Sequence, residues 1–245
     1  MKTPPRFAID SQPGADATAR VTGPEAHHMR DVMRIAPGET VTLIDANGSE
    51  YAAQLVRYDR AAAELRVLAM RPAPPRARLI VAQAIIKGPR MAFVVEKAAE
   101  LGATELWPLT CARGLVRTSA PARHTRWNRL ALAAAKQSLL APPMQVREEL
   151  TFGELIRDAT RGALADALRL VCSAGAEAMA ALLERERPRA ILIAIGPEGD
   201  FTPDEIAAAL SAGFIAAGLG PARLRSETAA IAALAIASQW LARAV

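Results

Sequence analysis

The fold of this chain is decided by residues 190–206, which read AILIAIGPEGDFTPDEI. The opening run Ala190–Ile195 has the length and the β-branched content of a buried strand. A complete helix start follows, because Thr202 is a good N-cap, Pro203 suits the first helical position and Glu205 can close a capping box. The sequence therefore predicts a strand, a short loop and a helix.

The loop between them, residues 196–201, lets a ligand approach closely. Gly196 and Gly199 flank Pro197 and Glu198, so the backbone can turn sharply and present its N–H and C=O groups without side chains in the way. A Gly-Pro turn that only connects two elements is the alternative. A second glycine loop, residues 219–228 (LGPARLRSET), again lies between an apolar run and a long apolar helix, which favours a binding site.

Composition bounds the class of protein. The 245 residues, of which 51% are hydrophobic, can form one large core or two smaller ones. The net charge is +5, and only four of the 30 basic residues are lysines. Arginine suits phosphate and base recognition through its planar fork, although a GC-rich genome would raise alanine and arginine together. The charge favours an anionic partner such as nucleic acid without identifying it.

Several classes of protein are not expected. The start of the chain has no apolar signal region, and no run of about 18 uncharged apolar residues occurs, so we expect a cytoplasmic protein with no membrane partner. Cys111 and Cys172 are far apart and lack companions at ligand spacing, and His27 and His28 are the one adjacent histidine pair. Neither a metal site nor a disulfide framework is expected.

The first seventy residues predict a small β-barrel-like domain. Short strands are expected at residues 41–44, 51–58 and 63–70, with a hairpin turn at residues 45–49. A helix is expected at residues 24–35, where Arg30 and Arg34 would share one face. A solvated basic face is the commoner explanation of such a pair, and binding of a phosphate backbone is the other. A Pro-rich linker, residues 71–76, marks the domain boundary.

From Leu79 onward, strand and helix patterns alternate, which predicts a parallel sheet with helices on both faces. Ligands of such sheets bind beyond the C-terminal ends of the strands, where both glycine loops fall. A Rossmann fingerprint is absent, because neither loop has the G-x-G-x-x-G spacing after an early strand. The expected strands are 79–86, 105–109, 168–172, 190–195 and 214–219, and the expected helices are 91–101, 126–139, 152–161, 176–185, 203–211 and 227–244.

The two loops together resemble the paired motifs of the bacterial family of 16S ribosomal RNA uridine-N3 methyltransferases, part of the SPOUT superfamily. The resemblance covers nearly the whole chain in the same order of motifs. The matching positions are His28 to Arg34 with Gly38, Lys87-Gly88, Met91, Lys97, Glu100 to Gly102, Arg113, Gln137-Ser138, Ile195 to Gly199, Leu219 to Pro221, Leu224-Arg225 and Glu227-Thr228. The chain departs from the family pattern at Lys136, Leu140, Asp200 and Ala222.

The resemblance implies two domains, a PUA-like RNA-binding β-barrel at residues 1–72 and a SPOUT α/β domain at residues 77–245. It implies a parallel sheet, a C-terminal trefoil knot that binds S-adenosylmethionine, a homodimer that completes the site, and 16S rRNA of the small ribosomal subunit as partner. The implied cofactor-binding residues are Gly196, Pro197, Glu198, Gly199, Leu219, Gly220, Leu224, Thr228 and Ala229. The implied RNA-binding residues are His28, Arg30, Arg34, Lys87 and Arg113.

Two side chains are candidates for the chemistry that the resemblance implies. Arg225 can stabilise negative charge on the pyrimidine oxygens of the uridine. Glu227 is a possible base, but a carboxylate is a weak base for this proton, and a favourable position at a helix N-terminus is the preferred explanation. Methyl transfer to another uridine or to a ribose 2′-hydroxyl of rRNA or tRNA is an alternative function. A non-catalytic RNA-binding protein for ribosome assembly is another.

Overall fold

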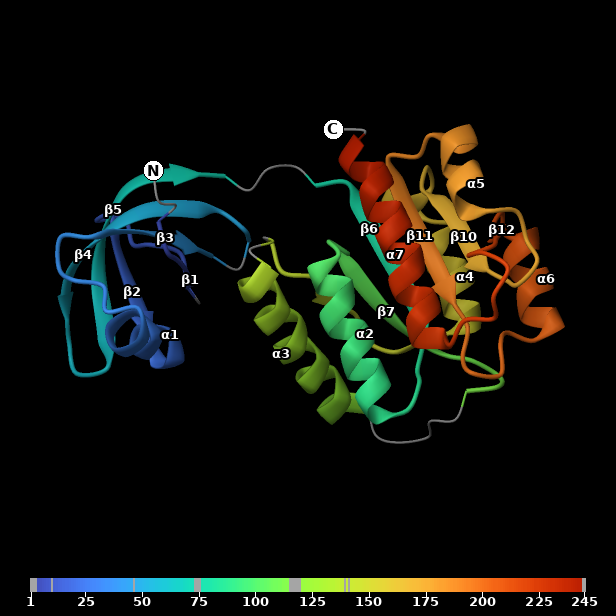
Figure 1. The fold of residues 1–245 in the computed structure, drawn as a ribbon, viewed down its shortest axis with the longest axis horizontal. Coiled ribbons are helices and arrows are strands. Elements are labelled where there is room, and N and C mark those ends of the chain that lie inside the picture. Colours follow the sequence, from blue (N-terminus) through green and yellow to red (C-terminus); the bar gives the residue numbers. More distant parts are fainter. Residues whose placement is uncertain are drawn as a thin grey trace. The chain divides into compact units, whose positions relative to one another are not determined.

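The computed structural model describes residues 4–9, 11–45, 47–72, 76–114, 120–138, 140 and 142–243. The chain divides into two compact units, which Figure 1 colours along the sequence. The first unit holds residues 1–75 and the segment 135–143, and the second holds residues 76–134 and 144–245. Each unit has its own sheet and hydrophobic core.

The first unit is built on a five-stranded, curved sheet with the order β1-β3-β4-β5-β2 (Figure 1). All neighbouring strands are antiparallel except the parallel pair β1–β3. The three strands predicted from alternation are confirmed, and the two that the sequence did not predict are the short β1 and the polar β2. The strands are β1 (Arg6–Ala8), β2 (Thr18–Thr22), β3 (Thr40–Ile44), β4 (Glu50–Tyr58) and β5 (Ala62–Arg71).

The predicted helix at residues 24–35 is much shorter in the structure. Helix α1 covers Gly23–His27 and continues as a π-helical turn, His28–Val32. Arg34 then adopts a left-handed conformation with φ of 54°, so the prediction that Arg30 and Arg34 share a helix face is wrong. The helix ends here because Met29 and Ile35 are both buried and the Ile35 amide donates to the Met29 carbonyl oxygen.

The predicted hairpin turn between β3 and β4 is confirmed and is organised by Asp45, which is only 3% exposed. The carboxylate of Asp45 accepts hydrogen bonds from the backbone amides of Asn47 and Ser49, both at 2.9 Å, and from the Tyr51 hydroxyl at 3.0 Å. Such local bonds satisfy a buried carboxylate and fix the turn at the same time.

The second unit contains the predicted parallel sheet. Its strand order is β12-β10-β11-β6-β7-β8, with β9 also paired to β7, and every pair is parallel. Strands β8 and β9 were not predicted, because two residues are too few to carry a pattern. The strands are β6 (Arg78–Ala84), β7 (Glu105–Thr110), β8 (Gln145–Val146), β9 (Leu150–Thr151), β10 (Leu168–Cys172), β11 (Ala190–Ile195) and β12 (Ile215–Ala217).

Strand β11 is buried on both faces, and its side chains divide between two cores. Ile191, Ile193 and Ile195 point into the core under α2, α3, α5 and α7, whereas Leu192 and Ala194 join the core under α4 and α6. Covered faces explain why the strand reads as one continuous apolar run. The helices are α2 (Gly88–Glu100), α3 (Ala120–Ser138), α4 (Phe152–Ala159), α5 (Met179–Glu186), α6 (Pro203–Ser211) and α7 (Ser226–Arg243).

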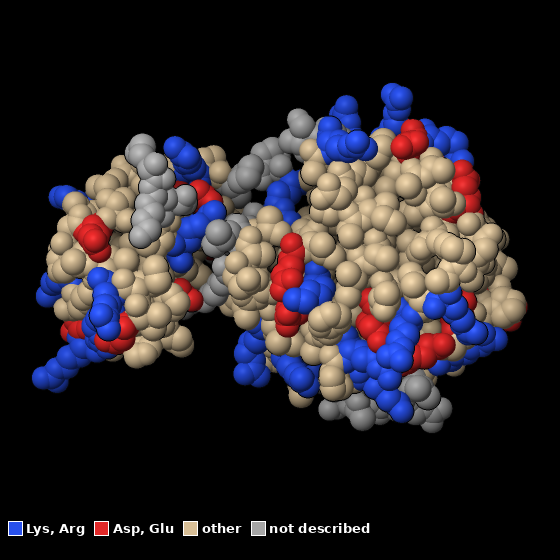
Figure 2. Space-filling view, in the orientation of Figure 1, with Lys and Arg blue, Asp and Glu red and all other residues tan. Residues whose placement is uncertain are grey.

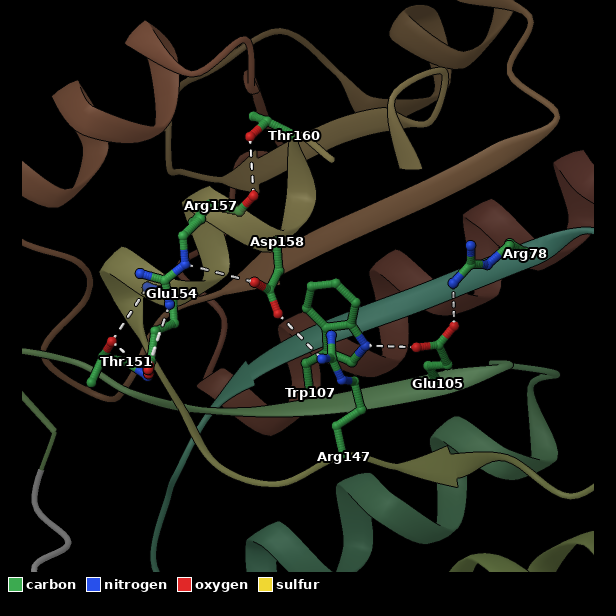
Figure 3. Close-up of polar contacts among 9 residues, drawn as sticks. All are labelled: Arg78, Glu105, Trp107, Arg147, Thr151, Glu154, Arg157, Asp158 and Thr160. Carbon is green, nitrogen blue, oxygen red and sulfur yellow. Dashed lines mark hydrogen bonds and ion pairs between the residues drawn. The ribbon is translucent and has the colours of Figure 1, made fainter. Parts of the chain in front are cut away.

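A network of polar side chains surrounds the buried Trp107 of β7 and pairs its indole N–H (Figure 3). The indole N–H donates to Glu105 at 2.9 Å, and Glu105 also pairs with Arg78. The guanidinium of Arg147 lies 4.5 Å from the ring centroid of Trp107 and pairs with Asp158 at 3.2 Å. A large aromatic side chain is therefore buried with its one donor paired and its face covered by a cation.

The central position of β11 predicts an unequal cost for two leucine truncations. Leu192 is 0% exposed, whereas Leu210 on α6 is 46% exposed. We expect Leu192→Ala to lower the free energy of unfolding by about 2–5 kcal/mol through lost burial and a cavity. Leu210→Ala should change it by less than about 0.5 kcal/mol. Urea denaturation measures both, and equal losses would contradict the described core.

Candidate active site

A cavity of about 340 Å³ lies where both glycine loops meet, at the C-terminal ends of β10, β11 and β12. Its volume falls within the roughly 300–1,000 Å³ of small-molecule pockets. Seven of the nine residues predicted to bind a cofactor line it, and so does Arg225. The seven are Gly196, Pro197, Glu198, Leu219, Gly220, Leu224 and Ala229.

Three other predicted residues do not line this cavity, namely Gly199, Thr228 and Glu227. Sequence reasoning also missed part of the wall, which is formed by the end of β10 and the residues after it, Cys172 to Ala174. A usable signal existed, because β10 was predicted as a strand and parallel strands bring their carboxyl ends to one edge. The site therefore combines three strand ends rather than two.

Buried hydrogen bonds tie the two glycine loops together. Gln83 of β6 is 0% exposed, and its side-chain amide donates to the Ser226 hydroxyl at 2.9 Å. Ser226, the first residue of α7, in turn donates to the carbonyl oxygen of Gly196 at 2.5 Å. The chain links residues 143 positions apart in the sequence. These bonds fix the start of α7 against the first loop, at the wall of the cavity.

Arg90, near the start of α2, bridges the same two segments nearer the surface. Its guanidinium lies 3.3 Å from Glu198 in the first loop and 3.9 Å from Glu227 in the first turn of α7. The second carboxylate oxygen of Glu227 is buried and has no hydrogen-bond partner within the described residues. Arg90 could not be predicted from the sequence, because nothing local distinguishes it from other exposed arginines.

The first loop is also held from the side of β7. Arg113 donates to the carbonyl oxygen of Gly199 at 3.0 Å, and the backbone amide of Ala112 donates to Glu205 at 2.9 Å. Glu205 and Thr202 form the predicted capping box of α6. In the structure, Arg113 therefore supports the loop, which is a different contact from the RNA contact that the family resemblance implied.

Asp200 explains one departure from the family pattern. Its φ is 62°, a left-handed conformation that glycine adopts freely and aspartate tolerates better than most residues. The carboxylate of Asp200 accepts a hydrogen bond from the Phe201 amide at 2.8 Å. The backbone position therefore keeps the geometry that glycine permits, and the substitution adds a carboxylate to the wall of the cavity.

Gly218 is required by packing below the second loop. A Cβ at this position would lie 2.4 Å from the carbonyl oxygen of Ala176. The backbone of Gly218 also donates to Glu177 at 2.7 Å and accepts from Met179 at 2.9 Å. These contacts join the end of β12 to the start of α5, so they position the loop that follows.

The two cysteines are buried thiols. Burial, with a smaller contribution from the Asp200 carboxylate, raises the pKa of Cys172 to about 12. Burial, with Glu205 as the smaller cause, also raises the pKa of Cys111 to about 12. A thiol with so high a pKa is not a nucleophile at neutral pH. Cys172 therefore contributes shape, not covalent chemistry, to the cavity wall.

The predicted RNA-binding residues fall in both units. His28 and Arg30 are exposed on the first unit, where His28 packs edge-on against Phe7 and Arg30 pairs with Asp31. Lys87 is exposed just before α2 in the second unit. Among the described residues, no three His, Cys, Asp or Glu side chains gather as metal ligands. None of the described helices has the length and apolarity to span a bilayer.

Comparison with known proteins identifies the class. A family described as an RNA methyltransferase domain matches residues 73–238, and an RNA methyltransferase PUA domain matches residues 21–68. These matches define the chain as an RNA methyltransferase with a PUA domain. They confirm the predicted PUA-like and SPOUT-type α/β fold, whereas the trefoil knot stays a prediction.

Individual relatives give the particular family. Ribosomal RNA small subunit methyltransferase E of Mycobacterium bovis is 32% identical over 97% of this chain and 94% of its own length. The Bacillus subtilis protein of that name is 27% identical over 90% of each. A solved structure of the Neisseria gonorrhoeae enzyme, bound to S-adenosylmethionine, matches with a TM-score of 0.82, 28% identity and coverage of 96% and 97%. The chain belongs to the ribosomal RNA small subunit methyltransferase E family.

The packing around Gly218 yields a prediction with a matched control. Gly218→Ala would force a Cβ into the Ala176 carbonyl group, and we expect the free energy of unfolding to fall by about 1–3 kcal/mol. Gly153→Ala, in the first turn of α4 where nothing lies within 4 Å, should be neutral or stabilise by up to about 1 kcal/mol. Urea denaturation compares the two, and equal stability would contradict the described contact.

Proposed function

We propose that this protein transfers a methyl group from S-adenosylmethionine to N3 of a uridine in 16S rRNA of the small ribosomal subunit. The observation that carries the proposal is the cavity between the two glycine loops. The membership of the chain in the family supports it, as does the cofactor in the Neisseria gonorrhoeae structure. A ribosomal substrate favours a cytoplasmic location.

The residues around the cavity fit this cofactor. S-adenosylmethionine carries a positive sulfonium, an ammonium group and a carboxylate. The cavity wall offers two carboxylates, Glu198 and Asp200, and two guanidiniums, Arg223 and Arg225. Backbone at Gly196 and Gly220 can approach the ligand without a Cβ in the way. We propose that these loops hold the cofactor, which supplies an activated methyl group when bound.

The protein's own contribution is then mostly placement. Methyl transfer needs the acceptor nitrogen in line with the bond that breaks, and fixed placement can lower the barrier by about 7–11 kcal/mol. The bonds of Gln83, Ser226 and Gly196 keep the two loops in register for this purpose. Arg225 is proposed to stabilise negative charge on the uracil oxygens as N3 loses its proton.

We propose that Glu227 has a positioning role and does not act as a base. It lies in the first turn of α7, where a carboxylate is favoured by the helix dipole, and Arg90 is its nearest cation. Its absence from the cavity wall supports this role. We further propose that the first unit binds RNA through exposed His28, Arg30 and Arg34, and that a homodimer completes the site.

The test of the function is mass spectrometry of nucleosides from 16S rRNA of a deletion strain. We expect 3-methyluridine to be lost and to return when the gene is restored. Unchanged 3-methyluridine would contradict the proposal, and loss of a 2′-O-methyl nucleoside instead would support the alternative target. Calorimetry distinguishes the non-catalytic alternative from a methyltransferase, because a non-catalytic protein would bind RNA but would not bind S-adenosylmethionine.

Arg225→Ala is the sharpest test of the chemical role. We expect the single-turnover rate of methyl transfer to fall about 100–1,000-fold, the usual loss for one preorganised charge stabiliser. Arg225→Lys should restore only part of the rate, because a point charge does not reproduce the planar fork. Arg161→Ala, an exposed arginine after α4, is the control and should leave the rate unchanged.

A structural role for Arg225 makes a different prediction. If Arg225 only holds the second loop, the Ala variant should lose S-adenosylmethionine affinity and melt at a lower temperature. Calorimetry and thermal unfolding therefore decide between the roles, and a slow variant that also fails to bind the cofactor would remove Arg225 from the chemistry.

A further inference from the structure

A second, shallow cavity in the second unit is lined by cations. Arg187, Arg189 and Arg243 form its wall together with Trp240, and Glu184 is the one acidic residue among the described lining residues. We call these three arginines the arginine cluster. Arg187 follows α5, Arg189 immediately precedes β11, and Arg243 ends α7. Figure 2 shows basic side chains, with acidic ones among them, over the ends of α5 and α7 on the visible face.

The arginine cluster lacks internal partners. No ion pair or hydrogen bond of these three guanidiniums occurs within residues 76–114, 120–138 and 142–243 or the described part of the first unit. The neighbouring Arg185 contrasts with them, since it pairs with Glu177 at 2.6 Å and Glu186 at 2.9 Å. Glu177 and Glu186 are thus already engaged by Arg185, and against the single carboxylate of Glu184 the described wall of the cavity keeps two net positive charges.

Helix dipoles explain only part of this arrangement. A cation at the end of a helix gains about 0.3–1 kcal/mol, which accounts for Arg187 and Arg243. Arg189 lies between α5 and β11, so the dipole gives it no such gain. Three cations around a cavity with one carboxylate, that of Glu184, repel one another unless a further anion lies between them. The arrangement fits a bound anion better than it fits helix capping.

Trp240 adds a flat surface to the same cavity. Its indole N–H donates to the carbonyl oxygen of Pro188 at 3.3 Å, and this bond ties the ring to the segment that carries Arg187 and Arg189. Aromatic rings beside arginines stack on bases or sugars of nucleic acids, whereas a free phosphate needs no such surface. The combination favours a nucleic-acid backbone over a small anion.

The distance between the arginine cluster and the candidate active site also indicates that the ligand is a polymer. Strand β11 runs from the arginine cluster to the first glycine loop, and its six residues span about 20 Å. Helix α7 runs from Ser226 at the active-site cavity to Arg243, and its 18 residues span about 27 Å. One nucleotide cannot reach both places, but an RNA chain can.

We infer that the arginine cluster binds the phosphodiester backbone of the RNA substrate, about 20–27 Å from the nucleotide that is methylated. This inference rests on the proposed function, because it takes rRNA as the substrate. The second unit would then hold RNA at two places, beside the cofactor cavity and at the opposite edge of its sheet. The chemistry of the cluster is a charge contact and carries no base sequence information.

The test is a triple variant, Arg187→Gln, Arg189→Gln and Arg243→Gln, with binding to a 16S rRNA fragment measured across salt concentrations. Each phosphate contact contributes about 0.7–0.9 to the slope of log affinity against log salt, so the slope should fall by about 2–3. Affinity at low salt should fall at least about tenfold. The triple lysine variant should keep the slope, since charge is retained.

Arg185→Gln is the matched control, because it removes one charge from the same helix end but one already paired with two carboxylates. It should change the slope by much less than Arg189→Gln alone. The affinity for S-adenosylmethionine and the melting temperature of all variants should match the wild type. In methylation assays, KM for RNA should rise while kcat is retained.

The outcomes separate this inference from the proposed function. If the wild type methylates rRNA and the triple glutamine variant shows the same affinity and salt slope, the inference is wrong and the function stands. A change in oligomeric state with unchanged RNA affinity would likewise overturn it, and assign the surface to a second copy of the chain. If the wild type neither binds nor methylates rRNA, both the function and the inference fall.

Discussion

The hydrogen bonds from Gln83 through Ser226 to Gly196 hold the candidate active site together, because Ser226 belongs to the second glycine loop and Gly196 to the first. Glycine gives a loop close approach to a ligand and costs it rigidity. The buried bonds supply the rigidity from outside the loops, through a strand that contributes no residue to the cavity wall. An arrangement without these bonds would leave hydrogen-bonding groups of Gln83 and Ser226 unpaired in the core, which costs free energy.

The parallel sheet determines where such an arrangement can exist. Strands β10, β11 and β12 all end at one edge, and each is followed by a segment that reaches the cavity. Helix α7 then packs across β6 and β11, which brings Ser226 over Gln83. The site is thus a consequence of topology, and its polar side chains come from segments far apart in the chain.

Sequence reasoning succeeded where the signal is local. The run Ala190–Ile195 and the capping box of Thr202 and Glu205 identify themselves within a few residues, and both agree with the structure. Gln83 and Arg90 could not be found this way, because their roles depend on partners more than a hundred positions away. The predicted long helix at residues 24–35 failed for a different reason, since the burial of Met29 and Ile35 in the core of the first unit accompanies a turn that propensity does not predict.

The distribution of charge follows from the cofactor. The wall of the candidate active site carries two guanidiniums and two carboxylates, one of which, Glu198, also pairs with Arg90, and unpaired cations there would repel the sulfonium and ammonium groups of S-adenosylmethionine. A protein that must attract polyanionic RNA and hold a cationic methyl donor therefore has to separate the two tasks in space. Unpaired arginines at the opposite edge of the sheet meet that requirement, because charges beyond the Debye length of about 8 Å barely act on the bound cofactor.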